Sequence, residues 1–119
     1  MLRTSDNRRL AMSAAVPAHL ADAVDIAGNG ELFWHGHRAD EAARWLTGRG
    51  LGIIGGESYR THAVAWGSYL GSWETTPGRE PDEAWAAFAE RGLRQALAAI
   101  AAAPRDDYRY FLATIGHAP

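Results

Sequence analysis

Two histidines one residue apart, His35 and His37, are the first side chains in this chain that could do chemistry. On a strand, residues two apart share a face, so both imidazoles could bind one zinc ion. A third ligand such as His62 would have to come from a distant segment, and the chain has no cysteine. Two surface histidines in a loop beside Trp34 would give the same pattern, and we predict that no metal is bound.

Nucleophilic catalysis and phosphate binding need patterns that this sequence lacks. Ser58 with a histidine and an acid such as Glu57 or Asp40 could form a triad, but triads are recognised by geometry and no nucleophile elbow surrounds this serine. Glycines at 48, 50, 52, 55 and 56 flank a predicted strand. No helix start and no lysine follows them, as a phosphate-binding loop requires. The acid pairs at 40–41 and 82–83 stand at predicted helix starts, where they favour the helix dipole. We predict no catalytic residue and no cofactor.

The remaining candidates are aromatic and acidic side chains in segments that have no periodic reason for burial. Tryptophan and tyrosine dominate interface hot spots because they bury a large area and keep a polar group. For Trp73 and Tyr59, a core position and an interface position are both open. We predict a partner-binding surface on the loops around residues 57–59 and 69–74. Its predicted members are Trp34, His35, Glu57, Tyr59, Tyr69, Trp73 and Glu74.

Composition excludes several classes of function. The chain has 119 residues, 47% of them hydrophobic and 22% charged, which is typical of one globular domain. Its net charge is −2 and its twelve basic residues are scattered arginines, so it lacks the basic stripe of a nucleic-acid binder. No apolar run approaches the roughly 18 residues of a membrane span. The absence of cysteine fits a reducing compartment, and we predict a cytoplasmic protein.

The elements that must position these residues follow from periodicity and from glycines and prolines. Residues 1–15 are polar and without periodicity, which indicates a flexible tail before a single domain at 16–119. The predicted order is a helix over 17–26, a loop or brief strand over 31–37, a helix from 39 to about 48–50, a strand over 51–54, a turn at 55–59, a strand over 60–69, a loop over 71–81, a helix over 81–103 and a strand over 108–115.

The helix after Pro81 carries the strongest pattern. Its apolar face, spaced three and four residues apart, is formed by Trp85, Phe88, Leu93, Leu97 and Ile100. Gly92 lies within this stripe, although glycine costs about 1 kcal/mol relative to alanine inside a helix, which indicates close packing there. With the strand patterns, this helix predicts an α+β domain with a small, mostly antiparallel sheet and helices packed on one face.

The order of motifs from residue 39 onward is a further signal. In chain order they are Ala-Arg-Trp-Leu within a helix, Gly-Leu-Gly-Ile-Ile-Gly-Gly at 50–56, an acid and Tyr59, Trp73 in a polar loop, Glu-Ala-Trp at 83–85 and an aromatic strand at 108–115. This order resembles the immunity protein 40 family of bacterial polymorphic toxin systems, over residues 24–115. Its most specific element is the apolar strand that ends in Gly55-Gly56, an acid and Tyr59.

The resemblance implies a small cytoplasmic α+β protein that binds and neutralises a cognate protein toxin made by its own cell. The chain departs from the family at Glu57, where members carry aspartate, and over 71–74, where Gly-Ser-Trp-Glu replaces Asp-Asn-Trp-Tyr. If that run is a toxin contact, the toxin differs here or the contact lies elsewhere. Two alternatives are open: a small enzyme or ligand-binding protein that uses the 31–37 loop, and a structural subunit whose aromatic patch forms a homodimer.

Overall fold

The structure of the chain is a computed structural model, which describes residues 16–60, 69–103 and 107–117. In chain order its elements are the 3-10 helix η1 (Ala18–Ala23), strands β1 (Val24–Ile26) and β2 (Leu32–His35), the 3-10 helix η2 (Gly36–Arg38), helix α2 (Ala39–Gly48), strands β3 (Gly52–Arg60) and β4 (Tyr69–Glu74), helix α3 (Trp85–Ala101) and strand β5 (Tyr108–Ile115). The predicted tail over 1–15 lies outside the described residues, as does most of the strand predicted over 60–69.

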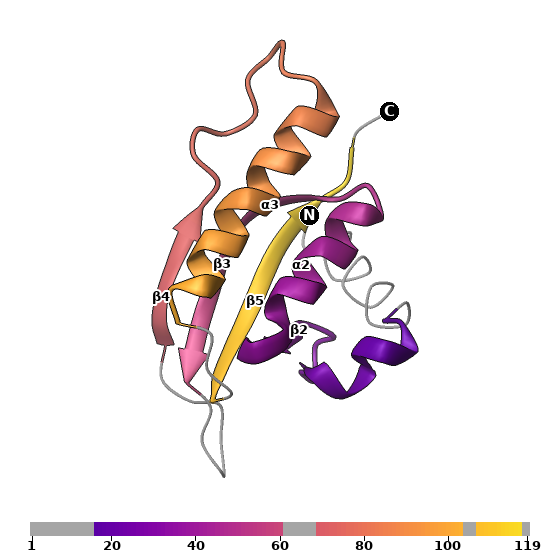
Figure 1. Cartoon of the computed structure of the whole chain (residues 1–119), viewed down its shortest axis with the longest axis vertical. Helices are drawn as coiled ribbons and strands as arrows, with labels where there is room; N and C mark the ends of the chain where they lie inside the picture. The colour runs from indigo at the N-terminus through magenta and orange to yellow at the C-terminus, as the bar shows by residue number, and fades with distance from the viewer. Residues whose placement is uncertain (1–15, 61–68, 104–106, 118–119) are drawn as a thin grey trace.

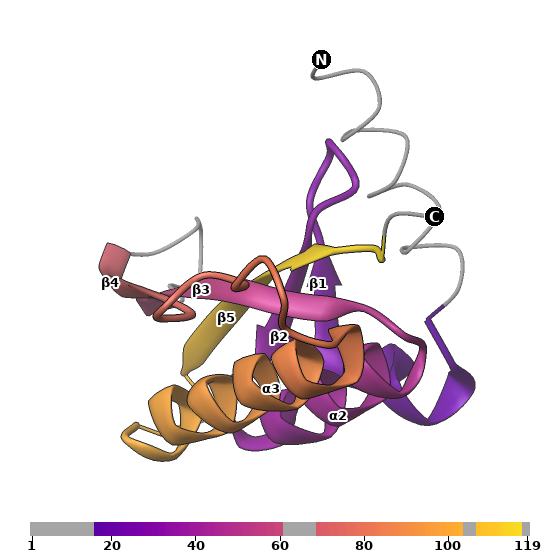
Figure 2. The same ribbon diagram turned by 90° about the horizontal axis from the view of Figure 1, so that it is seen from above.

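The five strands form one antiparallel sheet in the order β1-β2-β5-β3-β4. Helices α2 and α3 cover the same face of this sheet, and within the described ranges no helix lies on the opposite face (Figure 1 and Figure 2). This arrangement confirms the predicted α+β class, an antiparallel sheet with helices packed on one face. The strand β5, last in chain order, lies in the middle of the sheet between β2 and β3.

The core lies between the sheet and the helices and is built from alternate strand residues. Trp34 of β2, Ile53 of β3 and Tyr110 of β5 are almost fully buried there. Because side chains alternate along a strand, their neighbours point to the opposite, helix-free face. The helices contribute mostly small buried side chains, namely Ala39, Ala42 and Ala43 of α2 and Ala89, Gly92 and Ala96 of α3. Small side chains let the helices approach the sheet closely.

The closest approach is at Gly92, where α3 crosses β3. A Cβ atom on this glycine would lie 2.4 Å from the carbonyl oxygen of Ile53. That distance is far inside van der Waals contact, and the obstacle is backbone, which cannot turn away as a side chain can. The expected close packing around Gly92 is therefore confirmed, with the main chain of β3 as the neighbour.

The helix α3 begins at Trp85 and not at Pro81, so its predicted start is wrong. The residues before it form a turn that is tied to the helix by Arg91, whose guanidinium forms an ion pair with Glu83 (2.7 Å). These contacts hold the segment outside the helix although its sequence suits a first turn. Of the predicted apolar face, Phe88 and Ile100 are buried, Leu93 and Leu97 are partly buried against the core, and Trp85 is half-buried.

The strand β3 continues through Gly55 and Gly56, so the turn predicted at 55–59 is wrong. Gly56 pairs with Trp73 of β4, and a Cβ atom at position 56 would lie 2.3 Å from the indole atom Cη2. A Cβ atom at position 55 would lie 2.5 Å from the Trp73 carbonyl oxygen. The two glycines thus serve the close approach of β4 rather than chain reversal. Residues 71–74, predicted as a loop, belong to β4.

The first part of the domain is more extended than predicted. The helix predicted over 17–26 is limited to η1, and its last residues form β1, which pairs with β2 from Val24 opposite Trp34 to Ile26 opposite Leu32. β-branched side chains suit this paired strand better than a helix. The helix predicted from Ala39 is confirmed as α2.

Candidate functional site: the helix-free face of the sheet

The helix-free side of the sheet, which we call the open face, is built from alternate residues of the strands. Its members are Asp25 of β1, Phe33 and His35 of β2, Glu57 and Tyr59 of β3, Tyr69, Ser72 and Glu74 of β4, and Arg109, Phe111, Ala113 and Ile115 of β5. The register places distant segments side by side, since Glu57 pairs with both Phe111 and Ser72. The face is rich in aromatic and charged groups.

Four rings form a contiguous aromatic cluster on this face: Phe33, Tyr59, Tyr69 and Phe111. The Phe33 ring centroid lies 5.8 Å from that of Tyr59 and 5.8 Å from that of Phe111. The centroids of Tyr59 and Tyr69 are 5.7 Å apart, and Tyr69 is 57% exposed. Edge contacts of this kind hold rings in place. An ordered aromatic cluster that remains in contact with solvent is typical of a surface that binds a partner.

Next to the cluster, the hydroxyl of Tyr59 donates a 2.7 Å hydrogen bond to a carboxylate oxygen of Glu57. Burial raises the pKa of Tyr59 to about 12, and the hydrogen bond to Glu57 adds to this effect. The tyrosine is therefore a hydrogen-bond donor at neutral pH, and it fixes the carboxylate on the open face. The second oxygen of that carboxylate can still accept hydrogen bonds from outside.

A charged network joins three strands at the other side of the aromatic cluster. Asp25 of β1 lies 2.9 Å from Nε2 of His35 on β2 and accepts a 2.8 Å hydrogen bond from Nε of Arg109 on β5. Burial alone would raise the pKa of Asp25, but the hydrogen bonds from Arg109 and His35 together hold it below its usual value. The charge of Arg109 is therefore compensated within the protein by Asp25.

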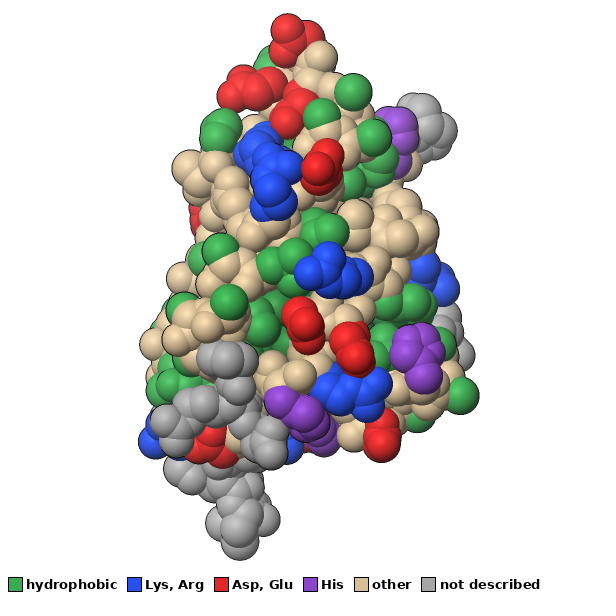
Figure 3. Space-filling view, viewed as in Figure 1, with side chains coloured by type: hydrophobic (Ala, Val, Ile, Leu, Met, Phe, Trp, Pro, Cys, Tyr) green, Lys and Arg blue, Asp and Glu red, His purple; other side chains and the backbone are tan. Residues whose placement is uncertain are grey.

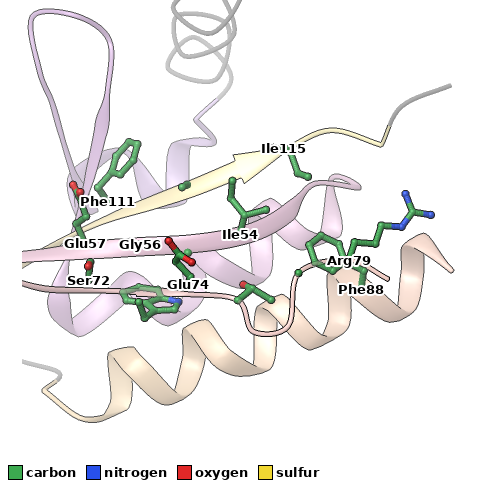
Figure 4. Close-up of a pocket in the computed structure, with 14 residues that line it drawn as sticks. Ile54, Gly56, Glu57, Ser72, Glu74, Arg79, Phe88, Phe111 and Ile115 are labelled. Carbon is green, nitrogen blue, oxygen red and sulfur yellow. The ribbon is translucent and has the colours of Figure 1, made fainter. Parts of the chain in front are cut away.

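A surface hollow of about 530 Å³ indents the sheet next to the aromatic cluster (Figure 4). Its position follows from the register, because Gly55 pairs with Ala113 on one side and Glu74 on the other, and two of these three positions carry little or no side chain. On the open face its lining consists of Glu57, Phe111, Ser72, Glu74, Ala113 and Ile115, with the exposed Ile54 of β3 beside them, and the rest of the lining includes Trp73, Thr75, Gly78, Arg79 and Phe88. Two carboxylates and an apolar wall thus share one depression.

The structure places the seven predicted site residues on two sides of the sheet. Five belong to the open face: His35, Glu57, Tyr59, Tyr69 and Glu74. Trp34 is 1% exposed and its ring lies 6.0 Å from that of Trp45, so its prediction as a partner-binding residue is wrong. Its position on β2 points it toward the helices.

Trp73 also faces the helices, but it is only half-buried and lines the hollow, so its role as a partner-binding residue stays a prediction. It is half-buried over Gly56, and its ring centroid lies 6.4 Å from that of Tyr110 in the core. Its Nε1 atom is buried without a hydrogen-bond partner among the described residues. Trp73 therefore packs partly against the core, and an interface role stays open for it. Tyr59, half-buried on the open face, is available to both roles.

Sequence reasoning missed four charged or aromatic members of the open face: Asp25, Phe33, Arg109 and Phe111. Arg109 and Phe111 could have been found from the alternation of the strand at 108–115, whose second face is partly polar. Asp25 was hidden because its segment was predicted as a helix. No local signal pairs it with Arg109, which is 84 residues away in the chain.

Among the described residues, which do not include His62, the geometry gives no support to the catalytic arrangements considered from the sequence. Ser58 Oγ lies 3.5 Å from the carbonyl oxygen of Gly71, on the face opposite to its neighbour Glu57. His35 points to Asp25, whereas His37 lies in η2 and is exposed. Among the residues that the structure describes, no group of three or more His, Cys, Asp or Glu side chains could hold a metal ion. The prediction of no bound metal stays a prediction.

Comparison of the chain with protein-family models, curated proteins and solved structures gives no match. The helices of the described part are also too short or too polar to cross a membrane. The open face and the motifs of the sequence are therefore the two features that bear on function.

Proposed function

We propose that this protein binds another protein through the open face, and that it acts as a bacterial immunity protein whose partner is a cognate toxin. The observation that carries the binding function is the aromatic cluster, four ordered rings on a face that no helix covers within the described ranges. The class of partner rests on the resemblance of the motifs at 50–59 and 83–85 to the immunity protein 40 family.

Charge distribution supports the choice of this face. On the helix-covered side, acidic and basic side chains lie next to each other (Figure 3). Arg38, for example, forms ion pairs with Asp22 and Glu41. On the open face, Asp25 is neutralised by Arg109, whereas Glu57 and Glu74 form no ion pair with any described residue. Unpaired carboxylates beside aromatic rings suit a basic partner surface, because they steer it into contact and the rings then bury area.

Neutralisation would need no chemistry of the protein's own. A partner seated on the open face would cover a rigid sheet surface, and its own active site would be blocked by contact or by steric overlap. Because such a toxin is made by the same cell, the two proteins would meet in the cytoplasm. The aromatic cluster would supply most of the affinity and the carboxylates mainly the association rate.

The test compares two exposed apolar side chains of similar exposure on different parts of the sheet. Tyr69 of the aromatic cluster is 57% exposed and Ile26 of β1 is 55% exposed. The partner is captured from the source bacterium with the wild-type chain and identified, and its affinity is measured for Tyr69→Ala and Ile26→Ala. We expect Tyr69→Ala to weaken binding about 30-fold, the equivalent of a 2 kcal/mol hot spot. Ile26→Ala should bind like wild type.

Expression of the captured partner in a bacterial host then tests neutralisation. Growth should be arrested by the partner, restored by the wild-type chain and Ile26→Ala, and restored poorly by Tyr69→Ala. A captured partner that does not arrest growth would contradict the proposed immunity function. Equal affinity of Tyr69→Ala and Ile26→Ala for the partner would show that the open face is not the binding surface. Sedimentation of the purified chain distinguishes the homodimer alternative, in which Tyr69→Ala would shift a dimer to a monomer.

A further inference from the structure

We propose that the hollow over Gly55 and Ala113 accepts one basic side chain, an arginine or a lysine, from the partner protein. This inference rests on the proposed protein-binding function and deepens it by naming the group that the partner inserts. It depends on three observations: the shape of the hollow, the two carboxylates at its rim, and the positions of the nearby arginines.

The shape fits a long side chain with an apolar stem. Ala113 carries only a methyl group, and around it the open-face part of the hollow is lined by the apolar groups of Phe111, Ile54 and Ile115. The whole hollow, which also extends to Trp73, Phe88 and Arg79, has a volume of about 530 Å³, within the range of about 300–1,000 Å³ typical of small-ligand sites. Lysine and arginine bury their methylene stems along such walls and keep the charged group at a polar rim.

The rim offers two negative charges that nothing in the described part of the chain neutralises. The Glu57 carboxylate accepts one hydrogen bond, from Tyr59, and the Glu74 carboxylate accepts none from a described residue. In Figure 4 the two carboxylates rise on the same side of the strands. A carboxylate has about four acceptor positions, so both can receive the fork of N–H groups that a guanidinium presents.

The nearby arginines do not occupy this place. Arg79 lines the other end of the hollow, but its Nε and Nη2 atoms donate to the carbonyl oxygen of Glu83 and its guanidinium lies 5.3 Å from the Trp85 ring centroid. In Figure 4 this guanidinium points away from Glu57 and Glu74. Arg109 is held by Asp25. The hollow is therefore negative at its rim, and it selects a cation over an anion.

Phe111 favours arginine over lysine as the inserted side chain. It forms a wall of the hollow next to Glu57, its cross-strand partner, so a guanidinium between the carboxylates can stack on its ring. Cations over aromatic faces are favourable, and arginine makes such contacts more often than lysine. An arginine would therefore satisfy the stem, the carboxylates and the ring together.

The experiment uses the full chain and three small probes followed by amide chemical shifts. The probes are N-acetyl-arginine amide, N-acetyl-norleucine amide as the uncharged stem, and N-acetyl-glutamate amide as the opposite charge. We expect saturable shifts from the arginine probe at residues 54–57, 72–74 and 111–115, with millimolar affinity, at least tenfold weaker binding of norleucine, and no binding of glutamate. Shifts that do not saturate, or equal binding of arginine and norleucine, overturn the inference.

Two variants locate the effect, and one matched variant controls for charge. The double variant Glu57→Gln/Glu74→Gln keeps an acceptor for Tyr59 and should weaken the arginine probe at least tenfold. Ala113→Leu fills the hollow and leaves its charge unchanged, and it should also weaken binding of the arginine probe at least tenfold. Glu90→Gln removes an exposed carboxylate of α3 and should leave binding unchanged. Equal affinity of the probe for the double variant and the wild type overturns the inference.

The same variants separate this inference from the proposed function. Tyr69 does not line the hollow, so Tyr69→Ala reports on the open face as a protein-binding surface. Loss of the captured partner in Tyr69→Ala, with full partner affinity in Glu57→Gln/Glu74→Gln, overturns the inserted basic side chain and leaves the proposed function standing. Loss of the arginine probe in the double variant, with full partner affinity in Tyr69→Ala, overturns the proposed function and leaves the hollow as a site for basic groups.

Discussion

The replacement of Gly92 by alanine tests the close packing of α3 on β3. In a free helix this change is favourable, because alanine exceeds glycine in helix propensity by about 1 kcal/mol. In this protein the added methyl group would lie 2.4 Å from the carbonyl oxygen of Ile53, about 1 Å inside an ordinary contact of about 3.5 Å. Either α3 or β3 must move by that amount along their packed length.

The magnitude follows from the two opposing effects. Insertion of a methyl group into a packed interface costs about 1–3 kcal/mol, and a backbone obstacle places Gly92→Ala near the upper end of that range. After the propensity gain of about 1 kcal/mol, we expect a net loss of about 2 kcal/mol in the free energy of unfolding. For a domain of this size that equals a fall of about 8 °C in the melting temperature.

A urea titration with a second glycine as control measures this effect. Gly48, the last residue of α2, has nothing within 4 Å of its virtual Cβ atom. Gly48→Ala should therefore leave stability unchanged or raise it by up to about 1 kcal/mol. The two substitutions are chemically identical and should have opposite signs. If Gly92→Ala stabilises the protein as Gly48→Ala does, the close contact between α3 and β3 is refuted.

Three further predictions concern the sheet. In an absorbance titration, Tyr59→Phe should remove a step near pH 12, and Glu57→Gln should lower the midpoint of that step, because burial first and then the carboxylate raise the pKa of Tyr59. The stability that Tyr59 contributes below pH 10 is lost as the pH rises through about 12. Since the pKa of Asp25 is lowered by folding, the destabilisation caused by Asp25→Asn should be full above about pH 4 and shrink at lower pH in urea titrations. A double-mutant cycle of Gly56→Ala and Trp73→Ala should show a coupling of about 1 kcal/mol or more, the double variant losing less than the sum; additive losses would contradict the overlap of the indole with position 56.

The helix α3 shows what the sequence can predict and where its information ends. The repeat of apolar residues at three and four positions is a local property, and it predicted a buried helix with Phe88 and Ile100 on its inner face. The start of the helix depends on a contact with Arg91, which lies in the helix itself and pairs with Glu83. Whether residues 81–83 form a first helical turn or a tethered loop therefore depends on a tertiary contact. The proline and acids at 81–83 favour a helix start in the sequence, and the structure has a loop there.

The Gly55-Gly56 pair shows a second limit. Two adjacent glycines are typical of a turn, and equally of a strand whose neighbour approaches closely, so the sequence alone does not separate the two. The deciding residue is Trp73, whose indole covers Gly56 from the next strand. The five open-face residues among those predicted came from residue type rather than from position: Glu57, Tyr59 and Glu74, for example, were expected in a turn or loop and lie on strands. Their partners across the sheet, such as Arg109, could not be predicted because pairing over 84 residues leaves no local pattern.

The central place of β5 has a consequence for how the protein is made. While the chain emerges from the ribosome, β1 with β2 and β3 with β4 can each form as separate hairpins, but the strand that lies between them is synthesised last of the five. Until residues 108–115 are available, β2 and β3 present unpaired inner edges, and such edges are where strands of other molecules add. Long-range pairing of this kind is slow compared with hairpin formation. The interval between synthesis of β3 and insertion of β5 is therefore the period in which the nascent chain is most exposed to aggregation. A substitution that delays the pairing of β5 would lower the yield of folded protein more than its effect on the stability of the final fold predicts.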